Sequence, residues 1–136
     1  MSRFWKISEA SSIGLHAMSF LASAPENRHT ARKMAKVFGF SEAHLSKVMQ
    51  LLHKAGLVRA VRGPTGGFQL AKPANEITML EVFEAIEGKL EPVECLLEKP
   101  VCKNRKCILG GMITEINNLT IHKLKTTTLA NLADSY

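Results

Sequence analysis

The thirty residues from Ser41 to Leu70 constrain the fold of this chain more than any other stretch; they read SEAHLSKVMQLLHKAGLVRAVRGPTGGFQL. The first part places apolar residues at i, i+3, i+4 and i+7, the spacing of one helix face, behind a serine that can cap the helix. Two short β-type segments follow, Leu57 to Arg62 and Phe68 to Ala71, joined by a glycine-rich turn. The pattern predicts a helix followed directly by a basic hairpin. The predicted apolar face is Leu45, Val48, Met49 and Leu52, and the opposite face is Ala43, His44, Lys47, Gln50 and Lys54.

A polar-faced helix followed by a two-stranded basic hairpin is the plan of a winged helix-turn-helix. In that fold the helix fits a DNA major groove and the hairpin contacts the backbone or the minor groove. The connection before the helix, Phe38-Gly39-Phe40, has a suitable length for such a helix pair. The alternative for the hairpin arginines is solvated surface charge. The residues that we expect at DNA are Ser41, Ala43, His44 and Lys47 on the helix and Arg59, Arg62, Pro64, Thr65 and Gly66 on the hairpin.

Positive charge is concentrated around this predicted surface. The net charge is +6, but residues 1–73 hold eleven Lys and Arg against three Asp and Glu, a net +8. Residues 74–136 hold seven against nine, a net −2. Charge alone would fit a basic protein without a nucleic-acid partner equally well. Its coincidence with the helix and hairpin favours double-stranded DNA as the partner, because phosphate binding requires a basic surface.

The rest of the sequence predicts a mainly α fold in which the only strands are those of the wing. A capping box opens the helix that begins at Thr78, because Glu81 stands three residues later. A long helix is predicted from Gly111 to about Thr127, with an apolar seam of Met112, Ile113, Ile116, Leu119 and Leu124. Such a seam needs a partner, so we predict a dimerisation helix; packing back onto its own domain is the alternative. The earlier helices are predicted over Ser8–Ala24 and from Thr30 to about Val37. The predicted divisions are a winged helix-turn-helix domain over 1–88, a cysteine-containing loop over 89–110, and the dimerisation helix with a C-terminal tail over 111–136.

All three cysteines fall within thirteen residues of the predicted loop, as Cys95, Cys102 and Cys107 with the spacing C-x6-C-x4-C. An odd number of cysteines in a chain without an evident signal peptide argues against a disulfide framework. Three thiolates in one loop could wrap a soft metal centre. Spacing alone leaves an iron–sulfur cluster, zinc, and a thiol switch or inert cysteines all open. Cationic neighbours that would favour thiolates are Lys99, Lys103, Arg105 and Lys106.

A fourth metal ligand would have to come from another part of the sequence. Glu9 begins the first helix and has no obvious ion-pair partner nearby in sequence, although an acid in a first helical turn is favourable by itself. Among the histidines, His29 stands in a predicted turn, His122 on the long helix is expected to be solvated, and His16 is expected in the core or an interface.

Taken together, these segments resemble the Rrf2 family of winged-helix transcription regulators, which includes iron–sulfur cluster regulators and nitric-oxide-sensitive repressors. The resemblance covers nearly the whole chain, and its most specific part is KAGLVRAVRGPTGGFQL at residues 54–70. It also rests on RFWKISE at residues 3–9, on EITMLEVFEAIEG at residues 76–88, and on the three clustered cysteines.

The resemblance implies a homodimer, an inverted-repeat operator, and a 2Fe–2S or 4Fe–4S cluster on Cys95, Cys102 and Cys107. The cysteine spacing of six and four departs from the family's more common five and five. In the cluster-biogenesis branch a histidine three residues beyond the third cysteine completes the site, and here that position is Gly110. In the nitric-oxide-sensing branch an acidic residue of the other subunit does so. Glu9 matches that position, as a glutamate where aspartate is usual.

We therefore expect a dimeric transcription factor, a repressor, whose operator affinity depends on an iron–sulfur cluster. The cluster would sense redox state, nitric oxide or iron–sulfur status; a thiol switch or zinc at the same cysteines is the alternative. An enzymatic or electron-transfer role is disfavoured, because the sequence has no nucleophile–base pair, phosphate loop or cofactor fingerprint. With no long apolar run and no apolar block at the N-terminus, we expect a cytoplasmic location and no membrane partner.

Overall fold

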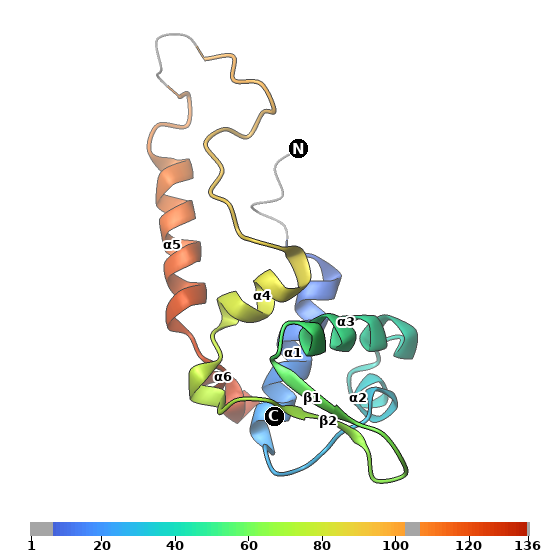
Figure 1. Cartoon of the computed structure of the whole chain (residues 1–136). Coiled ribbons are helices and arrows are strands. Elements are labelled where there is room, and N and C mark those ends of the chain that lie inside the picture. Colours follow the sequence, from blue (N-terminus) through green and yellow to red (C-terminus); the bar gives the residue numbers. More distant parts are fainter. Residues whose placement is uncertain (1–6, 103–106, 136) are drawn as a thin grey trace.

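The computed structural model describes residues 7–102 and 107–135, and its elements follow the predicted order (Figure 1). The mainly helical winged helix-turn-helix is confirmed. Within the described residues, no helix combines the length and apolar character needed to cross a membrane. The helices are α1 (Glu9–Ser23), α2 (Ala31–Phe38), α3 (Glu42–Lys54), α4 (Met79–Glu87), α5 (Met112–Thr126) and α6 (Leu129–Leu132), the strands are β1 (Val58–Val61) and β2 (Gly67–Leu70), and the 3-10 helices are η1 (Ala74–Glu76) and η3 (Ala133–Ser135).

Side-chain caps fix where the helices of the winged domain begin. The hydroxyl of Thr30 accepts a hydrogen bond from the backbone N–H of Lys33 at 3.1 Å, which starts α2. Gly39 ends the same helix in the left-handed conformation, with φ 73°. The predicted capping box of α4 is present, because Thr78 and Glu81 bond reciprocally through side chain and backbone. Because each cap bonds to a residue three positions further along the chain, the sequence alone predicts where these helices begin.

The core lies where α1 packs against α3 and α4. The predicted apolar face of α3 is buried in full, as are Ile13 and Leu21 of α1. The contacts of these faces bring the helix-turn-helix and the wing into one unit. The largest fully buried side chains are Ile13, Met18, Leu21, Met34, Leu45, Val48, Met49, Leu52, Val58, Ile77, Val82 and Leu129.

The C-terminal tail returns to this core, which the sequence did not predict. Leu129 of α6 is 0% exposed, and its backbone N–H donates to the carbonyl oxygen of Ile77 at 2.9 Å. Thr78 and Thr128 form an isolated antiparallel bridge next to it. The last helices, α6 and η3, pack on α1. The segment that follows α5 therefore contributes to the packing of the winged domain.

Helix α5 packs against α4 and extends away from the winged domain, together with the loop that connects the two helices (Figure 1). Its buried positions include Ile113 and Leu124. Other positions of the predicted seam are open, because Met112 is 42% and Leu119 is 69% exposed. We call α5 with the loop before it, residues 89–126, the cysteine arm. The wing and the tip of the cysteine arm lie at opposite ends of the molecule (Figure 1).

Candidate DNA interface and cysteine loop

Helix α3 carries the residues that the sequence predicts at DNA bases. Ser41 caps it, since its hydroxyl accepts from the N–H of His44 at 3.3 Å. Ala43 and Lys47 are exposed, and His44 is half-buried. The opposite face of the helix is fully buried, so α3 is held firmly with a polar, partly basic face toward solvent. That is the arrangement a recognition helix needs.

The wing is an antiparallel hairpin in which Val58 pairs with Leu70 and Val61 with Gly67. A hydrogen bond from the N–H of Gly66 to the carbonyl oxygen of Gly63, 3.0 Å long, closes its tip. The remaining predicted wing residues, Arg59, Arg62, Pro64 and Thr65, are all exposed, whereas Gly66 is half-buried.

Three contacts fix the wing relative to α3 and to the segment between α1 and α2. The Nδ1 atom of His53, in the last turn of α3, lies 3.1 Å from the carbonyl oxygen of Val58. The amide of Gln69 donates to the carbonyl oxygen of Pro25 at 2.8 Å. His29, in the segment between α1 and α2, forms a two-bond bridge with Phe68. The wing and α3 are thus held together, although the DNA roles of their individual residues remain predictions.

The structure gives His29 and Gln69 positioning roles that sequence reasoning missed. His29 was expected in a turn, yet it is buried and its backbone pairs with β2 through bonds of 3.0 and 2.7 Å. Its pairing with β2 also separates it from the cysteine arm of the same chain. No local sequence signal marks either residue, because both act through partners distant in sequence.

The loop between α4 and α5 carries the three cysteines, all as free thiols. Cys95 and Cys102 are half-buried and Cys107 is exposed. The backbone N–H of Leu97 donates to Cys95 Sγ at 3.5 Å, and that of Leu109 donates to Cys107 Sγ at 3.4 Å. Such donors stabilise negative charge on sulfur and tune metal–thiolate centres.

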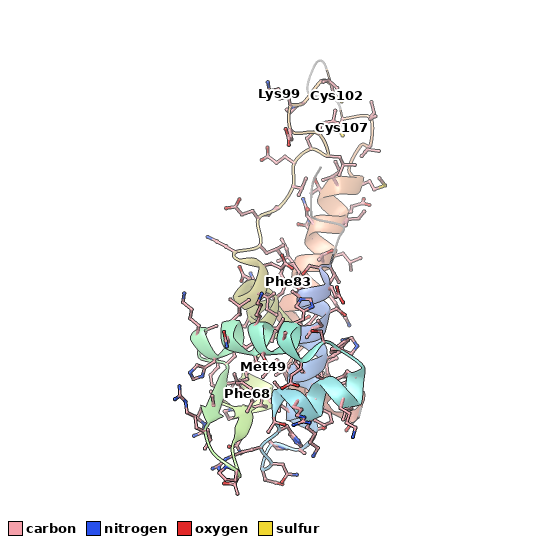
Figure 2. All side chains as sticks on the ribbon, turned by 90° about the vertical axis from the view of Figure 1, so that its right-hand side faces the viewer. Met49, Phe68, Phe83, Lys99, Cys102 and Cys107 are labelled. Atoms are coloured by element: carbon pink, nitrogen blue, oxygen red, sulfur yellow. The ribbon has the colours of Figure 1, made fainter. Side chains whose placement is uncertain are left out.

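Figure 2 shows Cys102 and Cys107 at the far end of the loop, near Lys99. The predicted cationic neighbours Lys103, Arg105 and Lys106 lie outside the described residues. The donor chemistry, three thiols in one loop, fits a soft metal centre. In the part of the chain that the structure describes, however, no three His, Cys, Asp or Glu side chains are gathered closely enough to hold a metal ion.

Glu9 lies in the first turn of α1 and is exposed. This end of α1 adjoins the end of α4, because the hydroxyls of Ser8 and Ser11 both donate to the carboxylate of Glu87. Figure 1 places the start of α1 at the base of the cysteine arm and away from the loop tip. A single chain therefore does not bring Glu9 together with the cysteines, and a cluster ligand from the partner subunit stays a prediction.

Asn117 of α5 holds the beginning of the cysteine loop. It is 7% exposed, and its Nδ2 donates to the carbonyl oxygen of Val93 at 2.7 Å while its Oδ1 accepts from the N–H of Val93 at 3.4 Å. The side chain thus pairs with the backbone of Val93 as another peptide group would. Because Val93 is two residues before Cys95, this clamp fixes the root of the loop to α5. Sequence reasoning missed it, since an asparagine in a helix gives no such sign.

The fold of this chain, from the winged domain through α5, matches known proteins. A model of the Rrf2 family, described as an iron-dependent transcriptional regulator, matches residues 7–135. The structure is similar to CymR (YrzC), the global cysteine regulator of B. subtilis, with 30% identity, TM-score 0.80, and coverage of 96% of this chain and 98% of that chain. It is similar to oxidized Staphylococcus aureus CymR, with 27% identity, TM-score 0.77, and coverage of 95% and 96%.

A third similar structure is T. potens IscR, with 27% identity, TM-score 0.75, and coverage of 96% of this chain and 87% of that chain. Since the family match spans almost all of the described residues, it extends beyond the winged domain to the cysteine arm. Members of this family are DNA-binding transcription regulators and not enzymes. The chain belongs to the Rrf2 family of winged-helix transcriptional regulators.

Proposed function

We propose that this regulator is a cytoplasmic homodimeric repressor whose affinity for an inverted-repeat operator is set by the state of Cys95, Cys102 and Cys107. One observation carries the proposal: a preformed DNA-reading surface lies at one end of the chain, and three free thiols lie in a loop at the other. The loop is covalently continuous with α4, which packs on the core, and with α5, which extends from it.

The exposed apolar positions of α5 support the homodimer. Met112 is 42% and Leu119 is 69% exposed, so the helix has apolar surface available for a second copy. Two copies related by a two-fold axis would present two α3 helices to successive major grooves, which matches an inverted repeat. Any change in the loop that moves α5 relative to the winged domain would alter the spacing between the two helices. Operator affinity would then change without a change in the residues that touch DNA.

We assign the three cysteines as ligands of an iron–sulfur cluster, with Glu9 of the partner subunit as the fourth. The free thiols, the N–H donors to Cys95 and Cys107, and the iron-dependent description of the family support this assignment. A bound cluster would supply redox chemistry and reactivity toward nitric oxide. A carboxylate ligand forms a harder and more labile bond to iron than a thiolate does. Glu9 would therefore leave one iron more open to reaction than the cysteines do.

A thiol switch or a zinc site is the second candidate. It is favoured by the similarity to the global cysteine regulator of B. subtilis, at 30% identity, and by the oxidized form of the Staphylococcus aureus protein at 27%. In a thiol switch, two cysteines of the loop would form a disulfide and lose two protons and two electrons to an oxidant such as a peroxide. The same loop would be reshaped with no metal present.

Anaerobic purification with measurement of iron, acid-labile sulfide and visible absorption separates the two candidates. For a cluster, we expect the wild type to contain stoichiometric iron and sulfide. Both should be lost, with the helical signal retained, in each of the variants Cys95→Ala, Cys102→Ala and Cys107→Ala. A colourless protein whose operator binding changes reversibly with a disulfide reductant would instead establish the thiol switch. Loss of the helical signal together with the metal would point to a structural metal.

The role of Glu9 is tested by comparing Glu9→Ala with Glu9→Cys in anaerobic absorption and resonance Raman spectra. A thiolate in place of the carboxylate should change the metal–ligand bands, and alanine should leave a less stable centre. Glu26→Ala, which removes an exposed carboxylate next to the wing, is the matched control. If Glu9→Ala retains the wild-type spectrum and nitric oxide reactivity, Glu9 is not a ligand.

A further inference from the structure

His29 is a buried side chain whose polar atoms have no hydrogen-bond partner. The residue is 6% exposed, and within the described residues neither ring nitrogen is paired. Native proteins contain few such groups, because an unpaired buried donor or acceptor is destabilising. An apolar ring of similar size would remove that penalty. The presence of an imidazole at this position therefore calls for a functional reason.

The surroundings of His29 explain why a ring lies at this position, but not why the ring carries polar nitrogens. The backbone is fixed by the bridge to Phe68, and the ring lies against Phe20 with the two centroids 4.8 Å apart. Gly67 passes so close that a Cβ atom there would lie 2.7 Å from the carbonyl carbon of His29. These contacts are to backbone and to an aromatic ring, so a phenylalanine would satisfy them equally well.

A polar cavity of about 420 Å³, widely open to solvent, adjoins His29 between the start of α2 and the wing. Two cations contribute to its lining, Arg28 and Lys33, against one carboxylate, Glu26. The capped N-terminus of α2 begins next to it at Thr30, and helix N-termini favour anions. The wall on the side of the wing is formed by Thr65 and Gln69. The cavity thus combines positive charge with hydrogen-bond donors, and His29, whose two ring nitrogens are closed to solvent, is among its lining residues.

We propose that this cavity binds a phosphate-type oxyanion, held by Arg28 and Lys33, and that the ring of His29 turns toward the cavity to donate an N–H to it. A tetrahedral oxyanion offers acceptors to several donors at once, and a guanidinium can pair with two of its oxygens. The oxyanion could be a phosphate of the DNA backbone, since Thr65 of the wing tip also lines the cavity, or a free phosphate group. This site is separate from the cysteines. Binding of a DNA phosphate here would rest on the proposed function, whereas binding of a free phosphate would not.

The charges around His29 give the site a pH dependence. Burial and the neighbouring Lys33 lower the pKa of His29, which favours the neutral imidazole. The charged groups that face it are Lys33 from α2 and Arg28 and Glu26 from the preceding segment, while Phe20 of α1 and Gln69 of β2 are uncharged. A bound anion would oppose the effect of Lys33. Anion binding should therefore raise the pKa of His29 and become tighter as the imidazole gains a proton.

The test is a ¹⁵N NMR titration of the histidine rings in the full chain without DNA, with inorganic phosphate against chloride at equal ionic strength. We expect the His29 signals to move and its pKa to rise, while the other four histidines serve as internal controls.

His29→Phe assigns the signals and keeps the ring packing. It should be at least as stable as the wild type and should lose the stabilisation by phosphate. Lys33→Gln should weaken phosphate binding by roughly tenfold, whereas Lys36→Gln, on the same helix but outside the cavity, should not.

A second arm replaces inorganic phosphate with a short random-sequence DNA duplex. A shift of the His29 signals with the duplex alone identifies the DNA backbone as the source of the oxyanion, and a shift with inorganic phosphate identifies a free anion. If neither ligand moves the His29 signals, or if His29→Phe responds to both as the wild type does, the proposal is wrong. A chain that binds phosphate here but no duplex would contradict the proposed DNA binding and leave this site intact.

Discussion

The winged domain and the cysteine arm of this protein are built in different ways. In the winged domain α1, α3 and α4 share one buried core, and three separate contacts hold the wing to α3 and to the segment between α1 and α2. In the cysteine arm, the described residues 89–102 and 107–110 form no helix or strand, and the thiols are free. The helix and wing that we propose to read DNA are therefore held in place by the chain itself, whereas the cysteines of the proposed regulatory centre are not gathered.

This difference separates the region that is packed by the chain itself from the region that would depend on another molecule. The winged domain buries the apolar face of α3 within one chain, and contacts within the same chain hold the wing beside it. The cysteine arm leaves Leu119 69% exposed and offers thiols that a metal or an oxidant would have to gather. Stability thus resides mainly in the winged domain, and we expect the proposed response to a metal or an oxidant in the cysteine arm. Changes in each region should have separable effects, which the following predictions test.

The largest expected effect comes from Leu129→Ala, which tests whether the tail belongs to the winged domain. Because Leu129 is 0% exposed, its truncation should lower the free energy of unfolding by about 2–5 kcal/mol. Leu97→Ala in the cysteine loop removes the same atoms from a side chain that is 54% exposed, and should cost under about 0.5 kcal/mol. Urea denaturation followed by circular dichroism measures both. Equal effects of the two substitutions would refute the division into a packed domain and an open arm.

Asn117→Ala should loosen the root of the cysteine loop. The backbone N–H and carbonyl of Val93 lose their partner, a change of about 1–3 kcal/mol that should speed hydrogen exchange of the Val93 amide roughly 10- to 100-fold. Alkylation of Cys95 should accelerate more than that of Cys102 or Cys107, since Cys95 is two residues from the clamp. Asn118→Ala, at the exposed next position, is the control. Uniform acceleration at all three thiols would mean that Asn117 supports the whole arm and does not position Cys95.

Arg62→Ala should weaken DNA binding about tenfold and reduce the slope of log K against log salt by about one unit, if Arg62 contacts one phosphate. Lys99→Ala removes an exposed cation from the cysteine arm and should leave both quantities unchanged. Fluorescence anisotropy at several salt concentrations gives the two slopes. Equal losses for the two variants would show that the arm also contacts DNA.

A smaller effect is expected from pH, through Glu81 in the capping box of α4. Burial alone would raise the pKa of this carboxyl, but the backbone N–H of Thr78 and the ammonium of Lys72, 3.0 Å away, outweigh it, so the pKa is lowered. As pH falls toward the ordinary glutamate value of 4.5, residue 81 therefore takes up a proton more readily in the unfolded chain than in the folded one. This stabilisation is present above that pH and is lost as pH falls through the folded pKa. The group is half-exposed, so only tenths of a kcal/mol are expected.

Chemical denaturation of the wild type and of Glu81→Gln between pH 3 and 7 measures this contribution. The difference in stability between the two proteins should shrink as the carboxyl is protonated. Glu76→Gln, which removes an exposed carboxylate of η1, provides the baseline for acid effects elsewhere in the chain. A difference that stays constant across the range would show that the charge of Glu81 does not stabilise α4.

The sequence was most informative where structure is decided by neighbouring residues. Ser41, Thr30 and Thr78 cap helices through bonds to residues three positions on, so the pattern alone located α2, α3 and α4. The glycine-rich turn of the wing likewise marks its own position. In contrast, α6 spans four residues, too few for a helical period, and only a contact with Ile77 reveals that Leu129 is buried.

The candidate sites divide in the same way. The spacing of Cys95, Cys102 and Cys107 identifies three donors in one loop, but the geometry that would gather them depends on a metal, an oxidant or a partner subunit. Asn117 and His29 could not be found from the sequence, because each acts through a backbone group or cavity formed by distant segments. Local patterns therefore predicted the fold and the three candidate cysteine ligands. Asn117 and His29 were found only from contacts between distant segments.

The most direct test of the account compares operator affinity with the state of the cysteines. An operator is first selected from random DNA with anaerobically purified protein, and its Kd is then measured before and after exposure to oxygen or nitric oxide. The wild type should change its Kd by roughly 5- to 150-fold, the usual range for coupling between two sites. The triple variant Cys95→Ser, Cys102→Ser, Cys107→Ser should bind with one Kd in all conditions. A wild type that does not respond, or a triple variant that responds as the wild type does, would contradict control by the cysteine loop.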